Sequence, residues 1–124
     1  MKATVENKRG ITVIHLEGEI EYVHSNLLEQ KIDELYASKR NEKLIFNLEG
    51  LQFVGSTGIK PFIQMLKRLN QKKGMKPRFV GLPPEYERLF KAYETKKKPF
   101  SIFDSEQSAL KSYRQKMWTK KGNA

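Results

Sequence analysis

The chain has 124 residues, 38% of them hydrophobic and 31% charged, with 24 Lys and Arg against 14 Asp and Glu. This length suits one domain with a real hydrophobic core and is too short for two. The absence of cysteine excludes disulfides and thiolate metal sites. No stretch approaches the roughly 20 apolar residues of a membrane-spanning helix, and the first ten residues lack the apolar segment of a signal peptide. These features predict a cytoplasmic protein.

The net charge of +10 is unevenly distributed along the chain. Residues 1–58 carry 7 Lys and Arg against 9 Asp and Glu, a balance of −2, whereas residues 59–124 carry 17 against 5, a balance of +12. Such asymmetry indicates an acidic protein surface, a nucleic acid or an anionic membrane as a partner. A solvated surface that only keeps the protein in solution remains an equal alternative.

The first part of the chain predicts a β-hairpin and then a helix. Residues 3–6 and 10–17 are rich in β-forming residues, and Asn7–Gly10 between them is a turn. Gly18 is expected to break the second strand, and Ile20 and Val23 to be core residues in the following loop. Ser25 or Asn26 is expected to cap a helix that ends near Ser38, because apolar residues recur there at helical spacing.

The remaining elements alternate between strands and helices. Strands are predicted at 43–48, 76–82 and 100–103, and helices from the loop near residue 58 to about Lys73, from Pro83 onward, and after Asp104 or Ser105. The order β-β-α-β-α-β-α-β-α predicts an α/β fold with a largely parallel sheet, one antiparallel element and covering helices. We expect a single domain over residues 1–117 and a frayed basic tail over 118–124.

The inventory of reactive residues argues against an enzyme. The two histidines, His15 and His24, belong to no metal-binding motif, and no phosphate loop or dinucleotide fingerprint is present. The Gly-Ser-Thr-Gly run at 55–58 is not the Gly-x-Ser-x-Gly of a nucleophile elbow. We therefore predict no catalytic residues, no metal and no cofactor.

The same run, Gly55, Ser56, Thr57 and Gly58, places two hydroxyls between an apolar strand and an amphipathic helix. A hydroxyl at a helix N-terminus can cap free N–H groups, which would be a purely structural role. Those N–H groups and the helix dipole also favour negative charge, so the position would accept a phosphate. The residues of the run do not decide between the two roles.

The run nevertheless stands in a longer pattern. Residues 44–59, LIFNLEGLQFVGSTGI, resemble the signature of the STAS-domain family of bacterial anti-sigma factor antagonists, in which a buried strand leads through a short loop into a helix. Segments 10–20, 78–90 and 103–110 resemble other parts of the family pattern in the same order. The resemblance implies a STAS-like domain with a mixed sheet of four or five strands and about four helices.

The resemblance also implies a function. Members of the family act as regulatory switches: the unphosphorylated form binds an anti-sigma factor, often a serine kinase, and phosphorylation of a loop serine breaks the complex. That serine corresponds to Ser56, with Thr57 in reserve. The expected partner-binding residues are Gly55, Ser56, Thr57, Gly58, Lys60, Lys67 and Arg68, and the expected state is a monomer or weak dimer.

Two positions depart from the family pattern. Gly55 stands where the motif has an acid, and Pro61 falls early in the helix, where it cannot donate to a carbonyl four residues back. We expect the helix to begin near Gly58. The alternative function is a basic module that binds anions or nucleic acid without any phosphorylation switch.

Overall fold

The computed structural model describes residues 1–38, 43–53, 59–71, 77–93 and 99–113. The elements are β1 (Lys2–Lys8), β2 (Ile11–Ile20), α1 (Tyr22–Ser38), β3 (Leu44–Phe53), α2 (Ile59–Gln71), β4 (Arg78–Val80), α3 (Pro84–Tyr93) and β5 (Ser101–Phe103). A further helical segment covers residues 106–113. The predicted order of strands and helices is therefore confirmed.

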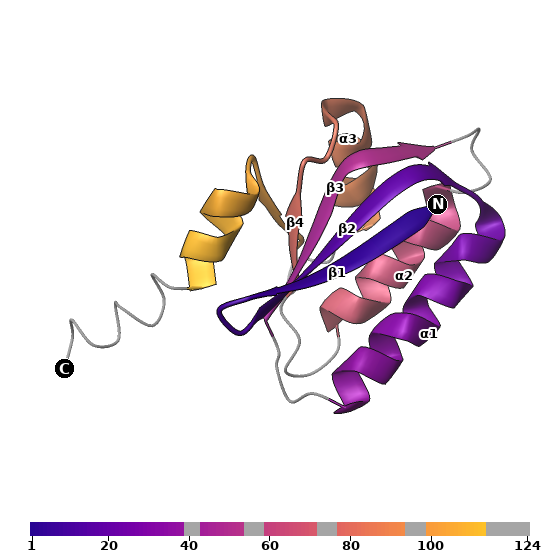
Figure 1. The fold of residues 1–124 in the computed structure, drawn as a ribbon. Helices are drawn as coiled ribbons and strands as arrows, with labels where there is room; N and C mark the ends of the chain where they lie inside the picture. The colour runs from indigo at the N-terminus through magenta and orange to yellow at the C-terminus, as the bar shows by residue number, and fades with distance from the viewer. Residues whose placement is uncertain (39–42, 54–58, 72–76, 94–98, 114–124) are drawn as a thin grey trace.

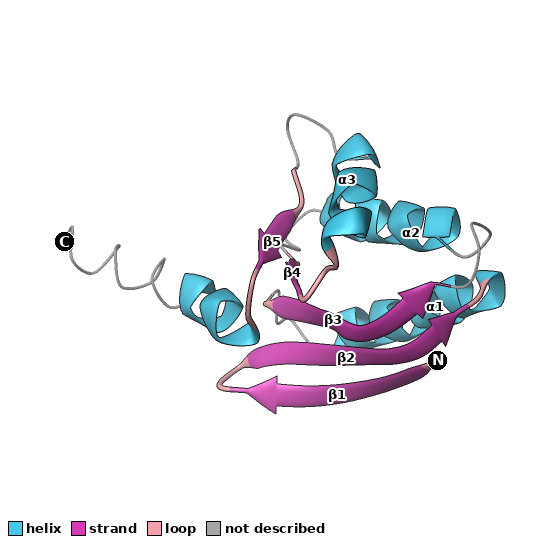
Figure 2. Cartoon of the chain, turned by 90° about the horizontal axis from the view of Figure 1, so that it is seen from above, coloured by secondary structure: helices cyan, strands magenta, loops and turns pink. Residues whose placement is uncertain are grey.

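The five strands form one mixed sheet in the order β1-β2-β3-β4-β5 (Figure 2). Strand β1 pairs antiparallel with β2, and the other neighbours pair in parallel. The hairpin turn consists of Arg9 and Gly10, both with positive φ, at 54° and 83°, as the tight turns that match the sheet's twist require. The side chain of Asn7 accepts a hydrogen bond from the Gly10 N–H at 3.1 Å.

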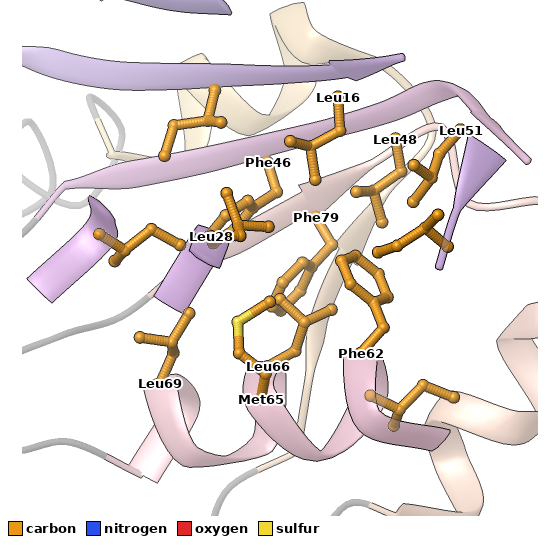
Figure 3. Close-up of a cluster of buried hydrophobic side chains, with 14 of the residues drawn as sticks. Leu16, Leu28, Phe46, Leu48, Leu51, Phe62, Met65, Leu66, Leu69 and Phe79 are labelled. Atoms are coloured by element: carbon orange, nitrogen blue, oxygen red, sulfur yellow. The ribbon is translucent and has the colours of Figure 1, made fainter. Parts of the chain in front are cut away.

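One face of the sheet is covered by α1, α2 and α3, and it holds the larger core (Figures 1 and 3). Phe79 lies in the middle of this core. Its ring stacks on Phe46 at 5.6 Å and meets Phe90 and Phe100 edge-on at 6.0 and 5.5 Å between ring centres. Helix α2 packs its apolar stripe here, and its buried side chains include Phe62, Ile63, Met65, Leu66 and Leu69.

The opposite face carries a smaller core under residues 106–113. The apolar side chains of Ile11, Val13, Ile45 and Val80 on the strands pack there with Ala109 and Tyr113. Ser105 caps the helix, because its hydroxyl accepts the Ser108 N–H at 3.1 Å. This confirms one of the two predicted caps.

Polar contacts fasten the same helix to the sheet. The Tyr113 hydroxyl accepts the Leu44 N–H and donates to the Leu44 carbonyl, both at 3.1 Å. Arg78 lies 4.3 Å from the centre of the Tyr113 ring and donates to the Ser112 hydroxyl at 3.1 Å. The helix thus depends on hydrogen bonds as well as apolar burial.

The start of α1 differs from the prediction. The helix begins at Tyr22, so neither Ser25 nor Asn26 is its cap; Ser25 is buried within it. The His24 Nδ1 atom accepts the Glu21 N–H at 3.0 Å, which is the reciprocal half of a capping box with histidine in place of the usual Glu or Gln. Sequence rules favour hydroxyl and acidic caps, so they miss this one.

Two further expectations about this region were wrong. Strand β2 does not stop at Gly18 but passes through it, with φ at +90°, and ends at the buried Ile20. Val23, expected in the core, is 51% exposed. Both errors have one cause: the strand runs further and the helix begins earlier than expected, which leaves no loop between them and turns Val23 outward.

Strand β3 is longer than its apolar run. The predicted strand ended at Leu48, but the structure extends it to Phe53, because residues 50–53 pair with residues 17–20 after the register between β2 and β3 shifts by one residue. Helix α2 then begins at Ile59, which agrees with the expected start near Gly58. Pro61 lies in its first turn, where a missing N–H costs no helical hydrogen bond.

Candidate partner-binding and phosphorylation site

The predicted site centres on Gly55, Ser56, Thr57 and Gly58, which lie outside the described residues. The elements on either side of them are well anchored. Leu51 in β3 is 5% exposed, and Phe62 and Ile63 in α2 are fully buried. The predicted site therefore lies in the sequence between a central strand and a helix fixed on the core, and the ends of such strands are common binding sites in α/β proteins.

The beginning of α2 favours an anion electrostatically. Its first turn contains no acidic residue, so the positive end of the helix dipole has no neutralising carboxylate within its own turn. Lys60 is exposed at this end, and Lys67 is partly exposed two turns further on. A phosphate added to the preceding loop would meet a favourable potential.

Arg68 differs from these two lysines because it already has a partner. Its guanidinium forms a two-pronged ion pair with Glu29 of α1, with Nε to Oε2 at 2.9 Å and Nη2 to Oε1 at 2.7 Å. The hydrogen bond to Glu29 raises the pKa of Arg68. This pair links α1 to α2, which run side by side (Figure 1). The sequence could not reveal the pairing, because the residues are 39 positions apart.

A polar cluster that sequence reasoning missed lies on the opposite face of the sheet. The His15 Nε2 atom is 2.7 Å from Glu6 Oε1 and 3.7 Å from Glu106 Oε1. Glu106 also forms an ion pair with Lys8 and accepts the Asn47 amide at 3.2 Å. Side chains alternate along β1 and β2, so Glu6, Lys8 and His15 lie on one face of the sheet. This alternation is the sequence pattern from which the cluster could have been predicted.

The charges in this cluster shift each other's protonation. Burial alone would raise the pKa of Glu106, but hydrogen bonds from Lys8 and Asn47 outweigh burial and lower it. The hydrogen bond to Glu106 in turn raises the pKa of Lys8. The cluster holds residues 106–113 on the sheet and is remote in sequence from the predicted loop, so we regard it as structural.

No group of three or more potential metal ligands occurs among the residues that the structure describes. None of the described helices combines the length and apolar character needed to cross a membrane.

A family comparison identifies the class of protein. The model of the STAS domain matches residues 2–109, and the chain belongs to the STAS domain family. The expected resemblance, the mixed sheet and the covering helices are thereby confirmed.

Individual relatives point in the same direction. The chain is 28% identical over 110 residues to the anti-sigma F factor antagonist of Paenibacillus polymyxa, covering 89% of this chain and 92% of the relative. A crystal structure of an anti-sigma factor antagonist from Mycobacterium paratuberculosis is similar with a TM-score of 0.68 and 26% identity, covering 91% and 93% of the two chains. The unphosphorylated anti-sigma factor antagonist SpoIIAA is similar with a TM-score of 0.66 and 20% identity, covering 91% and 98%. The phosphorylated form of SpoIIAA from Bacillus is similar with a TM-score of 0.63 and 19% identity, and the match covers 90% of this chain and 99% of SpoIIAA.

Proposed function

We propose that the chain is an anti-sigma factor antagonist, a regulatory protein without catalytic activity. The observation that carries the proposal is the match over nearly the whole chain to a relative of that name. The expected partner is an anti-sigma factor or a serine protein kinase. The docking surface comprises the loop at 55–58 together with Lys60 and Lys67 on α2.

The proposed switch is phosphorylation of Ser56. A phosphate adds about −1.5 to −2 charges at neutral pH, next to a helix N-terminus that favours them. The fold is expected to tolerate the modification because the flanking Leu51, Phe62 and Ile63 are buried independently of it. The partner would lose affinity because the phosphate largely cancels the positive charge of the docking surface.

The lysines of α2 have a different proposed role. Exposed charges at the rim of an interface act mainly on the association rate, and Lys60 and Lys67 are free of ion pairs at 4 Å among the described residues. The positive charge of Arg68 is already paired with the carboxylate of Glu29. We therefore expect reversal of Lys60 and Lys67 to slow association with an acidic partner more than reversal of Arg68 does.

The proposal is tested by comparing Ser56→Ala with Ser56→Asp. Partners are first recovered from native cells and identified by mass spectrometry, and binding is then measured by calorimetry. The Ala variant should bind like the unmodified protein, whereas the Asp variant should bind more weakly because it buries a charge without a counter-ion. Both should remain folded, with a stability loss of at most about 0.5–2 kcal/mol, the value of a helix cap.

Thr57→Asp serves as the matched control. A weakening by Thr57→Asp alone, with phosphate mapped to Thr57, would move the switch by one residue and connect the shift with Gly55 in place of the motif acid. Wild-type binding by all three variants, with neither hydroxyl ever modified, would remove the switch and leave only docking.

The second candidate, a nucleic-acid or anion-binding module, is supported by the +12 balance of residues 59–124. Many of these basic residues lie outside the described ranges. On this alternative, binding to duplex DNA should weaken with salt, with a log–log slope of about −0.9 per neutralised phosphate. Absence of DNA and RNA binding at low salt would eliminate it.

A further inference from the structure

An apolar groove of about 640 Å³ lies between the edge strand β1 and helix α1. Ala3 and Val5 of β1 line one side of the groove, and Leu27 and Leu28 of α1 line the other. Its polar lining residues, His24, Lys31 and Glu34, all come from α1. The groove is on the side of the sheet that α1 covers.

Exposed apolar side chains gather at this groove. Four large hydrophobic residues are exposed among the described residues. Val5 and Leu27 line the groove at 49% and 55% exposure, and Val23, at 51%, precedes Leu27 by one helical turn. The fourth, Leu89, is on α3 and is 38% exposed. A concentrated apolar patch of this kind indicates an interaction surface.

The strand that borders the groove has a free edge. Strand β1 is the outermost strand of the sheet and pairs only with β2. Its seven residues contain no proline, and its register with β2 runs without interruption from Lys2 to Lys8. A regular edge of this length offers N–H and C=O groups to another strand. The charges that ordinarily discourage such pairing, Lys2, Glu6 and Lys8, need to be accommodated by any partner.

A second copy of β1 accommodates Lys2 and Glu6, and Lys8 is already paired with Glu106 of its own chain. If two β1 strands pair antiparallel about a twofold axis at Thr4, Lys2 lies opposite Glu6 of the partner subunit, and Ala3 lies opposite the partner's Val5. Opposite charges in such pairs stabilise a sheet, and like charges destabilise it. Moving the axis to Val5 would place Lys2 opposite the partner's Lys8. The register centred on Thr4 is therefore favoured by charge.

We propose that the β1–α1 groove is a homodimer interface, in which two chains pair through β1 about a twofold axis at Thr4. Pairing about this axis joins the two five-stranded sheets into one sheet and places both α1 helices on the same side of it. The exposed Val5, Val23 and Leu27 of each copy then face those of the other. Lys60 and Lys67 are not among the residues lining the groove, so dimerisation leaves the proposed anti-sigma surface available.

The charge pairs give a sharp test by analytical ultracentrifugation. The wild-type chain should rise with concentration from 14.5 kDa toward twice that mass. Lys2→Glu alone should remain monomeric, because the new carboxylate would then stand opposite Glu6 of the partner subunit. Glu6→Lys alone should remain monomeric for the corresponding reason. An equimolar mixture of the two variants should dimerise again, because both charge pairs are restored between unlike chains.

A cysteine experiment tests the register independently of those charges. The chain has no cysteine, so Thr4→Cys introduces a single thiol on the proposed axis, within the distance that a disulfide spans between paired strands. Oxidation should give a covalent dimer, whereas Gln64→Cys, at an exposed position of α2, should give none. This test remains informative even if a charge variant fails to fold.

Two substitutions of exposed leucines, one at the groove and one away from it, test the apolar part of the interface. Leu27→Ser should abolish the dimer, and Leu89→Ser on α3 should leave it intact. A wild-type chain that stays monomeric up to millimolar concentration would overturn the proposal. A dimer unaffected by Leu27→Ser and by both charge variants would overturn it equally, because the interface would then lie elsewhere.

Discussion

The two faces of the sheet are held by different kinds of interaction. Among the described residues, the face under α1, α2 and α3 buries 17 in one apolar cluster, whereas the face under residues 106–113 buries six. On the second face, the Tyr113 hydroxyl, the Arg78 guanidinium and the Glu106 carboxylate supplement the small core. Apolar packing is nearly insensitive to pH, and polar anchoring is sensitive to it. The comparison predicts that the two faces respond differently to substitution, acid and salt.

The largest effect is expected in the helix-covered core. Phe79→Ala removes a ring that contacts three other phenylalanines and should lower the free energy of unfolding by about 3–5 kcal/mol in urea titration. Val80→Ala, the neighbouring residue on the opposite face, is the control and should cost about 2 kcal/mol. Equal losses would show that the two cores are not separate in their energetics.

The next effect concerns the anchor of the second face. Tyr113→Phe keeps the ring but leaves the Leu44 N–H and carbonyl without the hydroxyl, which should cost about 1–3 kcal/mol. Amide exchange should accelerate at Leu44, whereas the amides of α2 should exchange as in the wild type. Uniform acceleration throughout the chain would mean that the second face has no independent opening.

Acid should loosen the second face first. The pKa of Glu106 is lower in the folded state, so its contribution is complete above the ordinary glutamate value of about 4.3 and is lost as pH falls through the folded value. The raised pKa of Lys8 acts oppositely, and its contribution is lost as pH rises through the folded value, above about 10.4. Amide exchange in residues 106–113 should therefore increase below about pH 4.

Glu106→Gln is the control for acid loosening. It retains the shape of the side chain without a titrating group, so residues 106–113 should exchange faster at neutral pH and depend less on acid. An unchanged acid profile in this variant would assign the effect to another carboxylate.

The smallest effect should come from the pair between α1 and α2. Arg68 is 52% exposed and Glu29 19%, so a double-mutant cycle with Arg68→Met and Glu29→Gln should give a coupling of about 0.2–1 kcal/mol, decreasing with added salt. A coupling above about 2 kcal/mol would exceed the range for exposed pairs and would make this contact a principal link between the helices.

The succession of strands and helices was predictable because it depends on local patterns. Leu44, Phe46 and Leu48 of the strand pack in the same core as the apolar stripe of α2 at 62–69, as their periodicity indicated. The turn at Arg9 and Gly10 and the cap at Ser105 follow equally local rules. The order of elements already predicted one antiparallel pair in a largely parallel sheet, and the family pattern added the expectation of a STAS-like domain.

Features that depend on distant residues were not predictable. The extension of β3 to Phe53 requires pairing with β2, and the pair of Arg68 with Glu29 requires two helices to lie side by side. The histidine cap of α1 is local but uses an uncommon acceptor. The predicted site at 55–58 stays a prediction, supported by its flanking elements and by the family rather than by its own geometry.

The position of Tyr113 also bears on how the protein folds during synthesis. Residues 106–113 are the last described element to leave the ribosome, and their anchor at Leu44 lies 69 positions earlier. Synthesis proceeds from the N-terminus, so Ile11, Val13 and Ile45 emerge before Ala109 and Tyr113, the residues that pack on them. A nascent chain therefore passes through a stage in which these apolar strand residues are exposed to water. We expect chaperones that recognise apolar strands to engage the protein at that stage.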